Sequence, residues 1–286
     1  MEIAQLFFNG LAVGSIIALS AVGLTLTYGI LRLSNFAHGD FMTLGAYLTW
    51  VANTNGVNIW LSILVGAAGT IGAMLLSELL LWKPMRDRRA SSTTLIIISI
   101  GLALFIRSAI LLIWGSGNQS YALPLVPALD IGGVRVAFYR LIVIGLAIIA
   151  TLGLYFLLQN SKIGKAMRAV ADNLDLARVS GINVERVVLW TWILTGFLTA
   201  AAGALYGLIA VVRPNMGWFL ILPLFASVIL GGIGNPYGAI AGGLVIGLAQ
   251  ELSVPLLGSQ YKLGVALLVM VLILLVRPQG LFKGTF

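Results

Sequence analysis

The sequence predicts an all-α polytopic membrane protein with about eight or nine transmembrane helices. Of its 286 residues, 60% are hydrophobic and only 9% are charged, whereas about a quarter of the residues are charged in a soluble domain. Long apolar runs follow one another along the whole chain, and each spanning helix needs about 20 such residues. All seven tryptophans lie near the ends of these runs, where the membrane interface favours aromatic side chains.

Each apolar run is expected to form one helix of a single domain that covers residues 1–286, without a soluble module. The first run is interpreted as a span and not as a cleavable signal, because it begins at Glu2 and no basic region precedes it. The runs cover approximately residues 3–30, 36–52, 58–82, 94–114, 138–158, 188–212, 218–232, 238–256 and 261–276.

Composition excludes several kinds of site. The chain has no cysteine and a single histidine, His38, so disulfides, thiolate metal centres and multi-histidine metal sites are excluded. We expect no bound metal or cofactor. The net charge of +8 is attributed to basic cytoplasmic loops and not to nucleic acid binding.

The basic residues predict the orientation of the chain. They gather in two loops and the C-terminal tail, which the positive-inside rule places in the cytoplasm. The N-terminus is then outside and the C-terminus inside, and residues 218–256 cross twice with a turn near Gly231–Gly238. These basic residues are Lys83, Arg86, Arg88 and Arg89 in the first loop, Lys162, Lys165, Arg168, Arg178 and Arg186 in the second, and Arg277 and Lys283 in the tail.

The loop from Gly115 to Ala137 is then external, and Gly132-Gly133 between residues 129–131 and 134–136 predicts a short β-hairpin. This loop either touches an external partner or is a plain lid. Small residues four apart predict close helix packing, either inside one bundle or between two chains. These pairs are Gly10/Gly14, Gly203/Gly207, Gly238/Gly242 and Gly243/Gly247.

A polar interruption lies between Gly29 and Gly45. Charged residues cost about 2.5–3.5 kcal/mol each at the centre of a membrane helix, so this segment is either a polar turn at the cytoplasmic face or a broken span that lines a path. Its candidate path residues are Ser34, Asn35, His38, Gly39 and Asp40.

A second interruption lies in the other half of the chain. Breaks in corresponding halves are typical of transporters built from an internal inverted repeat, so we predict broken spans and such a repeat here. Chance similarity of two short segments is the alternative. The candidate path residues of this second break are Gly231, Gly232, Gly234, Asn235 and Gly238.

The loop from Ser161 to Asn183 carries apolar residues at helical spacing. Ser161 is expected to cap its first helix, Asp172 to cap a second short helix, and Gly181 to end it. The apolar face predicts contact with either the lipid surface or a groove on a partner. The residues of that face are Ile163, Ala166, Met167, Val170, Leu174 and Ala177.

The same loop resembles the coupling loop of bacterial ABC importer permeases. Residues 23–47, GLTLTYGILRLSNFAHGDFMTLGAY, and the ending RPQGLF at residues 277–282 resemble branched-chain amino acid permeases of the LivH type. The resemblance covers essentially the whole chain. Its coupling-loop residues are Gly164, Ala166, Met167, Arg168, Ala169, Asp172, Asn173, Ala177 and Gly181.

This resemblance implies a bacterial inner-membrane importer for branched-chain or neutral amino acids, although related permeases carry urea or other small polar solutes. It implies a second permease subunit, identical or homologous, two cytoplasmic ATP-binding subunits and an external solute-binding protein. It further implies that the coupling loop inserts its apolar side chains into the ATPase. No GxxxxGK[ST] motif occurs, so ATP hydrolysis is expected on the partner subunits and this chain is not expected to be an enzyme.

Two other functions remain as alternatives. Ser34, His38 and Asp40 would suit an intramembrane serine hydrolase, although no G-x-S-x-G elbow surrounds Ser34. An ion-coupled carrier or channel needs buried ionisable residues, for which Arg107 and Glu251 are the candidates, whereas Glu78 is expected to extend from the end of a span toward water.

Overall fold

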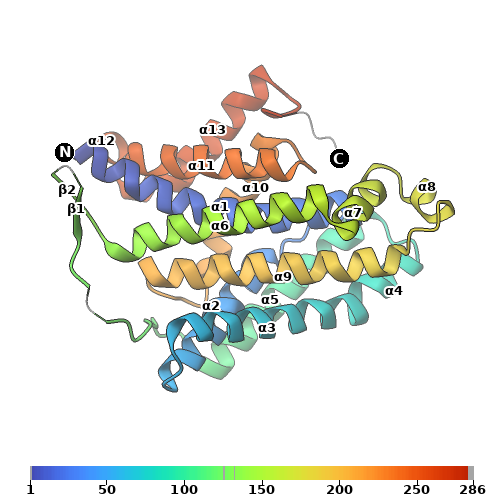
Figure 1. The fold of residues 1–286 in the computed structure, drawn as a ribbon, viewed down its shortest axis with the longest axis horizontal. Coiled ribbons are helices and arrows are strands. Elements are labelled where there is room, and N and C mark those ends of the chain that lie inside the picture. The colour runs from blue at the N-terminus through green and yellow to red at the C-terminus, as the bar shows by residue number, and fades with distance from the viewer. Residues whose placement is uncertain (1, 125, 132, 283–286) are drawn as a thin grey trace.

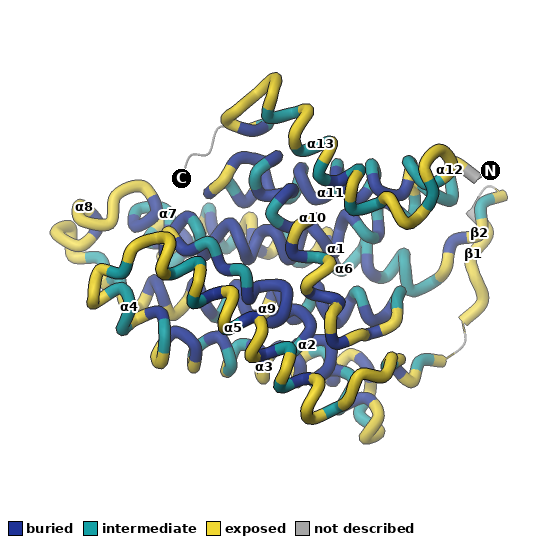
Figure 2. Tube along the Cα trace, turned by 180° about the vertical axis from the view of Figure 1, so that it is seen from behind, coloured by how far each residue is buried: buried dark blue, intermediate teal, exposed yellow. Residues whose placement is uncertain are grey.

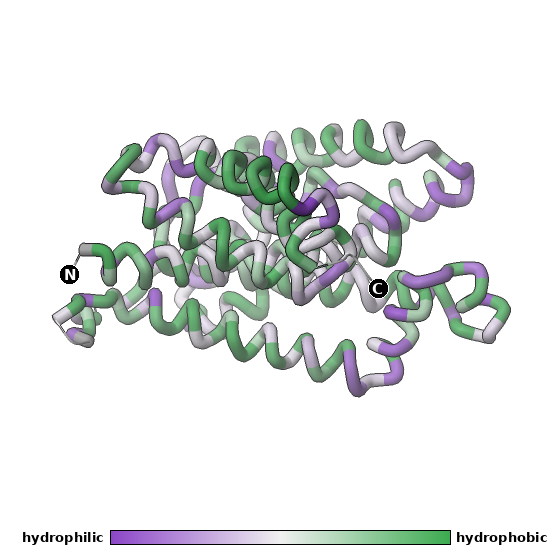
Figure 3. Tube along the Cα trace, turned by 90° about the horizontal axis from the view of Figure 1, so that it is seen from above, coloured by the Kyte–Doolittle hydropathy of each residue, from purple (hydrophilic) through white to green (hydrophobic). Residues whose placement is uncertain are grey.

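The computed structural model describes residues 2–124, 126–131 and 133–282. Long helices lie side by side along one axis of the molecule (Figure 1). Figure 3 shows hydrophobic residues along the outer helices and hydrophilic segments gathered mainly at the two ends. Gly132 of the predicted hairpin and Lys283 of the basic tail lie outside the described residues.

The elements fall into two helical halves and a middle section. The first half holds α1 (Glu2–Leu31), α2 (His38–Thr54), α3 (Ile59–Ser77), a π-helical turn (Glu78–Trp82), α4 (Lys83–Asp87) and α5 (Ser92–Trp114). The middle holds β1 (Leu129–Ile131), β2 (Val134–Val136), α6 (Phe138–Asn160), α7 (Lys162–Asp172) and α8 (Leu174–Val179). The second half holds α9 (Val184–Ile209), α10 (Met216–Gly231), α11 (Pro236–Leu252), α12 (Val254–Leu257), a 3-10 turn (Ser259–Tyr261) and α13 (Lys262–Val276).

All nine predicted apolar runs are helical, which confirms the fold class. In the described part of the chain, seven helices are long and apolar enough to cross a membrane. The other two runs form α2 and α10, which have only 17 and 16 residues. Both start inside the bundle, so they are the broken spans.

The long axis has two chemically different ends. One end, called the hairpin end, holds the N-terminus of α1 and the antiparallel strands β1 and β2, which confirms the predicted hairpin (Figure 1). The opposite end, called the basic end, holds α4, α7, α8 and the C-terminal tail. The tail is fixed there because Leu281 and Phe282 donate backbone hydrogen bonds to Leu230 and Gly231 at the end of α10.

The two halves have the same order of helices, but the chain runs through them in opposite directions. In the first half, α1 runs to the basic end, residues 32–37 return inward, and α2 runs from the interior to the hairpin end. In the second half, α9 runs to the hairpin end, residues 210–215 return inward, and α10 runs to the basic end. Each half then adds two more spans, α3 and α5 or α11 and α13. The order and direction of the elements therefore show the expected inverted repeat.

Helix α1 lies at the centre of the bundle. An apolar 18-residue window of this helix is 89% buried, against 6% for Ser259–Val276, which is the 3-10 turn together with α13 (Figure 2). A Cβ added to Gly10 would lie 3.0 Å from the Cα of Leu248 on α11, and a Cβ added to Gly14 would lie 3.0 Å from the Cα of Leu244. These small residues therefore serve packing inside one bundle, where they allow two helices to approach closely.

The expectation that Glu78 extends toward water is wrong. Its side chain is buried and accepts hydrogen bonds from Arg86 and from Nε1 of Trp192, the latter at 2.8 Å. The π-helical turn begins at this residue, and such turns are often found at functional sites.

Candidate functional site

The re-entrant stretch, residues 32–37, begins at the end of α1. Arg32 adopts a positive φ of 53°, a conformation that ends a helix because it turns the chain out of the right-handed path. The chain then runs back into the bundle until the Asn35 side chain accepts a hydrogen bond from the N–H of Ala37 at 3.1 Å. Helix α2 starts directly afterwards at His38.

His38 fixes the start of α2 deep in the bundle. Its Nε2 lies 2.9 Å from the carbonyl oxygen of Ser20, which can only accept, so Nε2 carries the proton. The hydroxyl of Thr199 lies 3.2 Å from the same nitrogen. Ser20 is about 17 Å from the end of α1 at Leu31, given a rise of about 1.5 Å per residue. The first break is therefore within the bundle, and not a turn at its surface.

Asp40 and Arg107 form an ion pair between α2 and α5. The carboxylate is 1% exposed and accepts two hydrogen bonds from the guanidinium, at 3.0 and 3.1 Å. The guanidinium also lies 4.8 Å from the ring centre of Trp218 on α10, a favourable cation–π distance. A paired charge of this kind avoids the large cost of an isolated charge in lipid.

These contacts argue against the alternative functions. The hydrolase interpretation needs His38 between Ser34 and Asp40, but His38 bonds Ser20 and Thr199, and Asp40 bonds Arg107. The two carrier candidates are both paired, because Glu251 accepts from Lys262 and Arg107 holds Asp40. Each of these charges already has a structural partner.

The breaks of the two halves meet at a pair of glycines. A Cβ added to Gly39 at the start of α2 would lie 2.3 Å from the carbonyl oxygen of Gly217 at the start of α10. The N–H of Gly217 donates to the hydroxyl of Thr43 at 3.0 Å. The inner ends of the two short helices α2 and α10 are therefore in direct backbone contact.

The second predicted interruption occupies a different place. Gly231 and Gly238 lie in backbone contact at the tight turn between α10 and α11, at the basic end. Gly232 and Gly234 have positive φ values of 104° and 90°, and Asn235 caps α11 by accepting from the N–H groups of Tyr237 and Gly238.

The expected correspondence between the two interruptions is therefore wrong. The counterpart of the re-entrant stretch is residues 210–215, which precede α10 as residues 32–37 precede α2. Residues 231–238 correspond instead to the turn between α2 and α3. The two predicted groups are linked through α1, because the N–H of Gly234 donates to the Thr25 hydroxyl at 2.9 Å. A role in a path stays a prediction for both groups.

The coupling segment, residues 161–183, forms α7 and α8 at the basic end. Ser161 caps α7 by accepting from the N–H of Gly164 at 2.9 Å, as predicted. Asn173 caps α8 through the N–H of Leu176, so the expectation that Asp172 is the cap is wrong by one residue. Gly181 follows α8 with a φ of 84°, as expected for a residue that ends a helix.

The apolar face of α7 is not free. Met167 is fully buried, and Val170 and Ala171 are buried beside it, because α7 packs on α1, α6 and α9 of the same chain. Gly164 is required at this fold-back, since an added Cβ would lie 2.2 Å from the carbonyl oxygen of Leu157. The expectation that Met167 is offered to a partner is therefore wrong.

The remaining coupling-loop residues are divided between the two helices. Arg168 donates to the side chain of Gln159 at 2.8 Å, and Ala177 packs inward. Ala166 and Ala169 are half-buried on α7, whereas Asp172 and Asn173 are exposed. On α8, Leu176 is 61% exposed and Val179 is 81% exposed, an apolar surface that periodicity did not single out.

A further contact holds the basic end together. Lys83 of α4 bonds Glu185, in the first turn of α9, at 3.1 Å.

Comparison with known proteins matches this architecture. The family model described as the branched-chain amino acid transport system permease component matches residues 6–275. The LivH permease of Salmonella typhimurium is 33% identical over 97% of this chain and 94% of its own length. BraD of Pseudomonas aeruginosa is 30% identical over 97% of this chain and 94% of its own. Both relatives are described as high-affinity branched-chain amino acid transport system permease proteins.

Solved structures share the fold at low sequence identity. An inward-facing metal-chelate type ABC transporter aligns with a TM-score of 0.54 and 16% identity, covering 96% of this chain and 85% of the other. PsaBC from Streptococcus pneumoniae, in complex with Fab, aligns with a TM-score of 0.51 and 13% identity, covering 95% and 91%.

The bundle and these alignments define the class as a multi-pass membrane permease subunit of an ABC transporter. The chain belongs to the branched-chain amino acid transport system permease family. The predictions of a transport subunit and of the LivH type are thereby confirmed.

Proposed function

We propose that this chain is the permease subunit of an ATP-driven importer that moves branched-chain or other neutral amino acids across a bacterial inner membrane. The observation that carries the proposal is the match of residues 6–275 to a family described by that transport system. The relatives named for branched-chain amino acids align over nearly their full length.

The proposed assembly contains a second permease subunit, two cytoplasmic ATP-binding subunits and an external solute-binding protein. The basic end faces the cytoplasm, because Lys and Arg concentrate in its loops. The hairpin end then faces outside, with the N-terminus, and is available to the binding protein. This orientation is the one predicted from the basic loops.

Helix α8 is the part of the coupling segment best suited to contact the ATPase. This helix lies at the tip of the basic end (Figure 1), outside the apolar spans, and its Leu176 and Val179 are exposed. Large exposed apolar side chains in water are typical of a surface covered by a partner. Arg178, also exposed on α8, provides a charged rim.

Reconstitution tests the transport function. The chain is purified with its native partners, placed in liposomes with its binding protein, and supplied with labelled leucine or urea. We expect leucine uptake that needs internal ATP. Uptake of urea alone would assign another small polar solute, and uptake by the permease without an ATPase would favour an ion-coupled carrier.

Substitutions on α8 test the docking surface. Leu176→Asp and Val179→Asp should prevent co-purification of the ATPase while leaving the permease folded, because they place charge in an apolar contact at a cost of several kcal/mol. Val126→Asp, at an exposed position in the loop at the hairpin end and outside the apolar spans, is the matched control. Met167→Glu should instead reduce the amount of folded permease. Normal ATPase binding by both α8 variants would contradict the assignment.

A further inference from the structure

Arg32 combines an unfavourable backbone conformation with a contact to the coupling segment. In the described part of the chain, only Arg32 and Arg89 among non-glycine residues have positive φ, 53° and 52°. Residues other than Gly, Asn and Asp rarely adopt this left-handed region of φ, because it is sterically unfavourable for them. Contacts that hold a residue in such a conformation often belong to a functional site.

The guanidinium of Arg32 reaches α7. Its Nη2 donates to the carbonyl oxygen of Ala171 at 3.3 Å, across 139 positions of sequence. Ala171 lies in the last turn of α7, where unpaired carbonyls carry partial negative charge and attract a cation. Arg32 therefore ties the end of α1 to the end of α7, directly before α8.

The residues that follow Arg32 are tied to α5 at two levels. The N–H of Phe36 donates to the hydroxyl of Ser99 at 3.1 Å. Four residues later, Asp40 holds Arg107 in the buried ion pair. Ser99 and Arg107 are about 12 Å apart along α5, from the rise of about 1.5 Å per residue. The segment 32–40 is thus attached to α7 at one end and to α5 along the rest.

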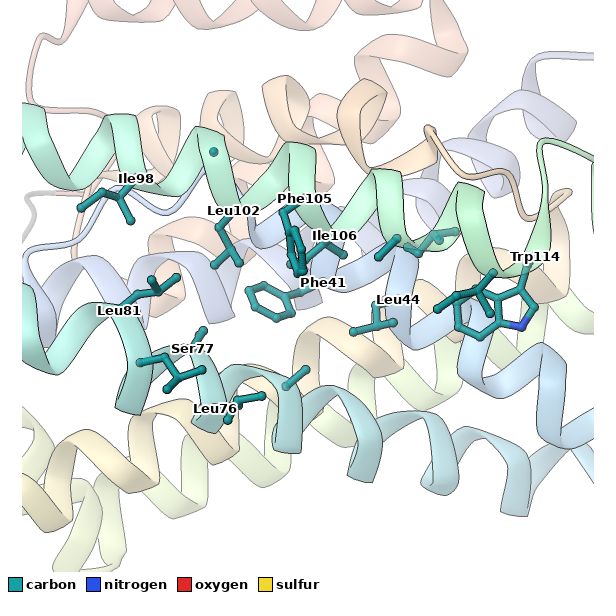
Figure 4. A pocket seen from close by; sticks show the side chains of 16 residues that line it. Phe41, Leu44, Leu76, Ser77, Leu81, Ile98, Leu102, Phe105, Ile106 and Trp114 are labelled. Carbon is teal, nitrogen blue, oxygen red and sulfur yellow. The ribbon is translucent and has the colours of Figure 1, made fainter.

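Helix α5 is otherwise loosely held. It packs mainly against α2, and an apolar groove of about 530 Å³ separates it from α3 (Figure 4). Side chains of Phe41, Leu76, Leu102 and Phe105 line this groove. Because α5 has the groove on one side and is bonded to segment 32–40 through Ser99 and Arg107 on the other, a shift of that segment would move α5.

We infer that Arg32 is a positioning residue that couples the ATPase-facing segment to α5 in the membrane. When α7 and α8 move with the ATPase, the Arg32–Ala171 contact passes that movement to residues 33–40, and the Ser99 and Arg107 contacts pass it to α5. This inference rests on the proposed function. It differs from simple helix capping, because a cap would affect stability and not the yield of transport from ATP hydrolysis.

The test compares Arg32→Gly with Arg89→Gly in the complete complex. Glycine accepts the positive φ at both sites, so both variants keep the backbone conformation and lose a whole arginine side chain, but only Arg32→Gly also loses the hydrogen bond to Ala171. In the described residues the side chain of Arg89 makes no hydrogen bond, which makes it the matched control. Solute uptake, ATP hydrolysis and thermal stability are measured in proteoliposomes with the binding protein, together with Arg32→Lys.

We expect Arg32→Gly to assemble and hydrolyse ATP, while uptake per ATP falls about tenfold, within the usual range of coupling between distant sites. Arg32→Lys should recover part of the loss, since an ammonium can also donate to the Ala171 carbonyl, and Arg89→Gly should match wild type. Unchanged uptake per ATP in Arg32→Gly overturns the inference, as does a loss of assembly or thermal stability in that variant. Failure of the wild-type complex to couple ATP to uptake would instead overturn the proposed function and the inference with it.

Discussion

The two broken spans have the same order of elements, but the chain segments that precede them are anchored at opposite ends of the molecule. Residues 32–37 are tied by side chains to the basic end, through Arg32 and the carbonyl of Ala171. Residues 210–215 are tied by backbone to the hairpin end, where Val212 and Gln119 exchange two hydrogen bonds of 2.9 Å. Inversion of the repeat therefore gives each break contact with one side of the membrane.

The breaks also differ in the forces that hold them. The first relies on a buried ion pair, Asp40–Arg107, and on the His38 hydrogen bonds. The break before α10, residues 210–215, relies on the backbone bridge between Val212 and Gln119 and on packing. They meet where Gly39 contacts Gly217 and where Arg107 lies over Trp218. A substitution at these contacts should therefore affect both broken spans.

Loss of the ion pair should have the largest effect. Asp40→Leu leaves the Arg107 guanidinium largely buried without its counter-charge, a change that costs about 3–5 kcal/mol. We expect little folded permease, measured as monodisperse protein after extraction and by its thermal midpoint. The double variant Asp40→Leu/Arg107→Leu removes both charges and should recover much of the yield. Equal yields for the single variant and wild type would show that the pair does not hold the first break.

Disruption of the contact between Gly39 and Gly217 should cause the second-largest loss of stability. Gly39→Val inserts side-chain atoms against the Gly217 carbonyl, which an added Cβ would approach to 2.3 Å, and overpacking costs about 1–3 kcal/mol. Gly153→Val on α6 is the control, because nothing lies within 4 Å of its added Cβ. The thermal midpoint should fall for Gly39→Val only, and a fall of the same size in both variants would contradict the close contact.

The smallest effect is expected at the turn between α10 and α11. Gly234→Ala must keep a φ of 90°, which costs about 1 kcal/mol in the left-handed region. Gly264→Ala on α13 provides the control, since its surroundings are open. A modest loss of stability with normal uptake per ATP would mark residues 231–238 as a structural turn. A loss of uptake at unchanged stability would support the predicted path role.

Much of this architecture could be predicted from the sequence, because lipid makes apolar run length a direct guide to spans. Periodicity and Ser161 located the coupling segment, and Gly132-Gly133 located the hairpin. The predicted correspondence between the two breaks was wrong because Asn235 and Gly238 resemble Asn35 and Gly39 in type and approximate spacing. The true counterpart of residues 32–37 is the segment 210–215, which contains fewer polar residues.

Burial was harder to predict than location. The apolar face of α7 suits a partner groove or its own bundle equally well, and only the packing of Met167 on neighbouring helices decides between them. The partner of Arg107 lies 67 positions away in sequence, a distance that helical spacing does not address. The exposure of Leu176 and Val179 is consistent with helical spacing, because neither is three or four residues from the buried Ala177 on this short capped helix.

Thiol labelling of single cysteines tests the opposite anchoring of the two breaks most directly. The chain has no cysteine of its own, and each break carries one exposed arginine, Arg32 or Arg213. An impermeant thiol reagent is applied to intact cells and to inside-out vesicles carrying Arg32→Cys or Arg213→Cys, with Asn118→Cys and Arg178→Cys as markers of the two ends. We expect positions 213 and 118 to label in cells, and positions 32 and 178 only in inside-out vesicles. Labelling of positions 32 and 213 from the same side would contradict the inverted arrangement of the breaks.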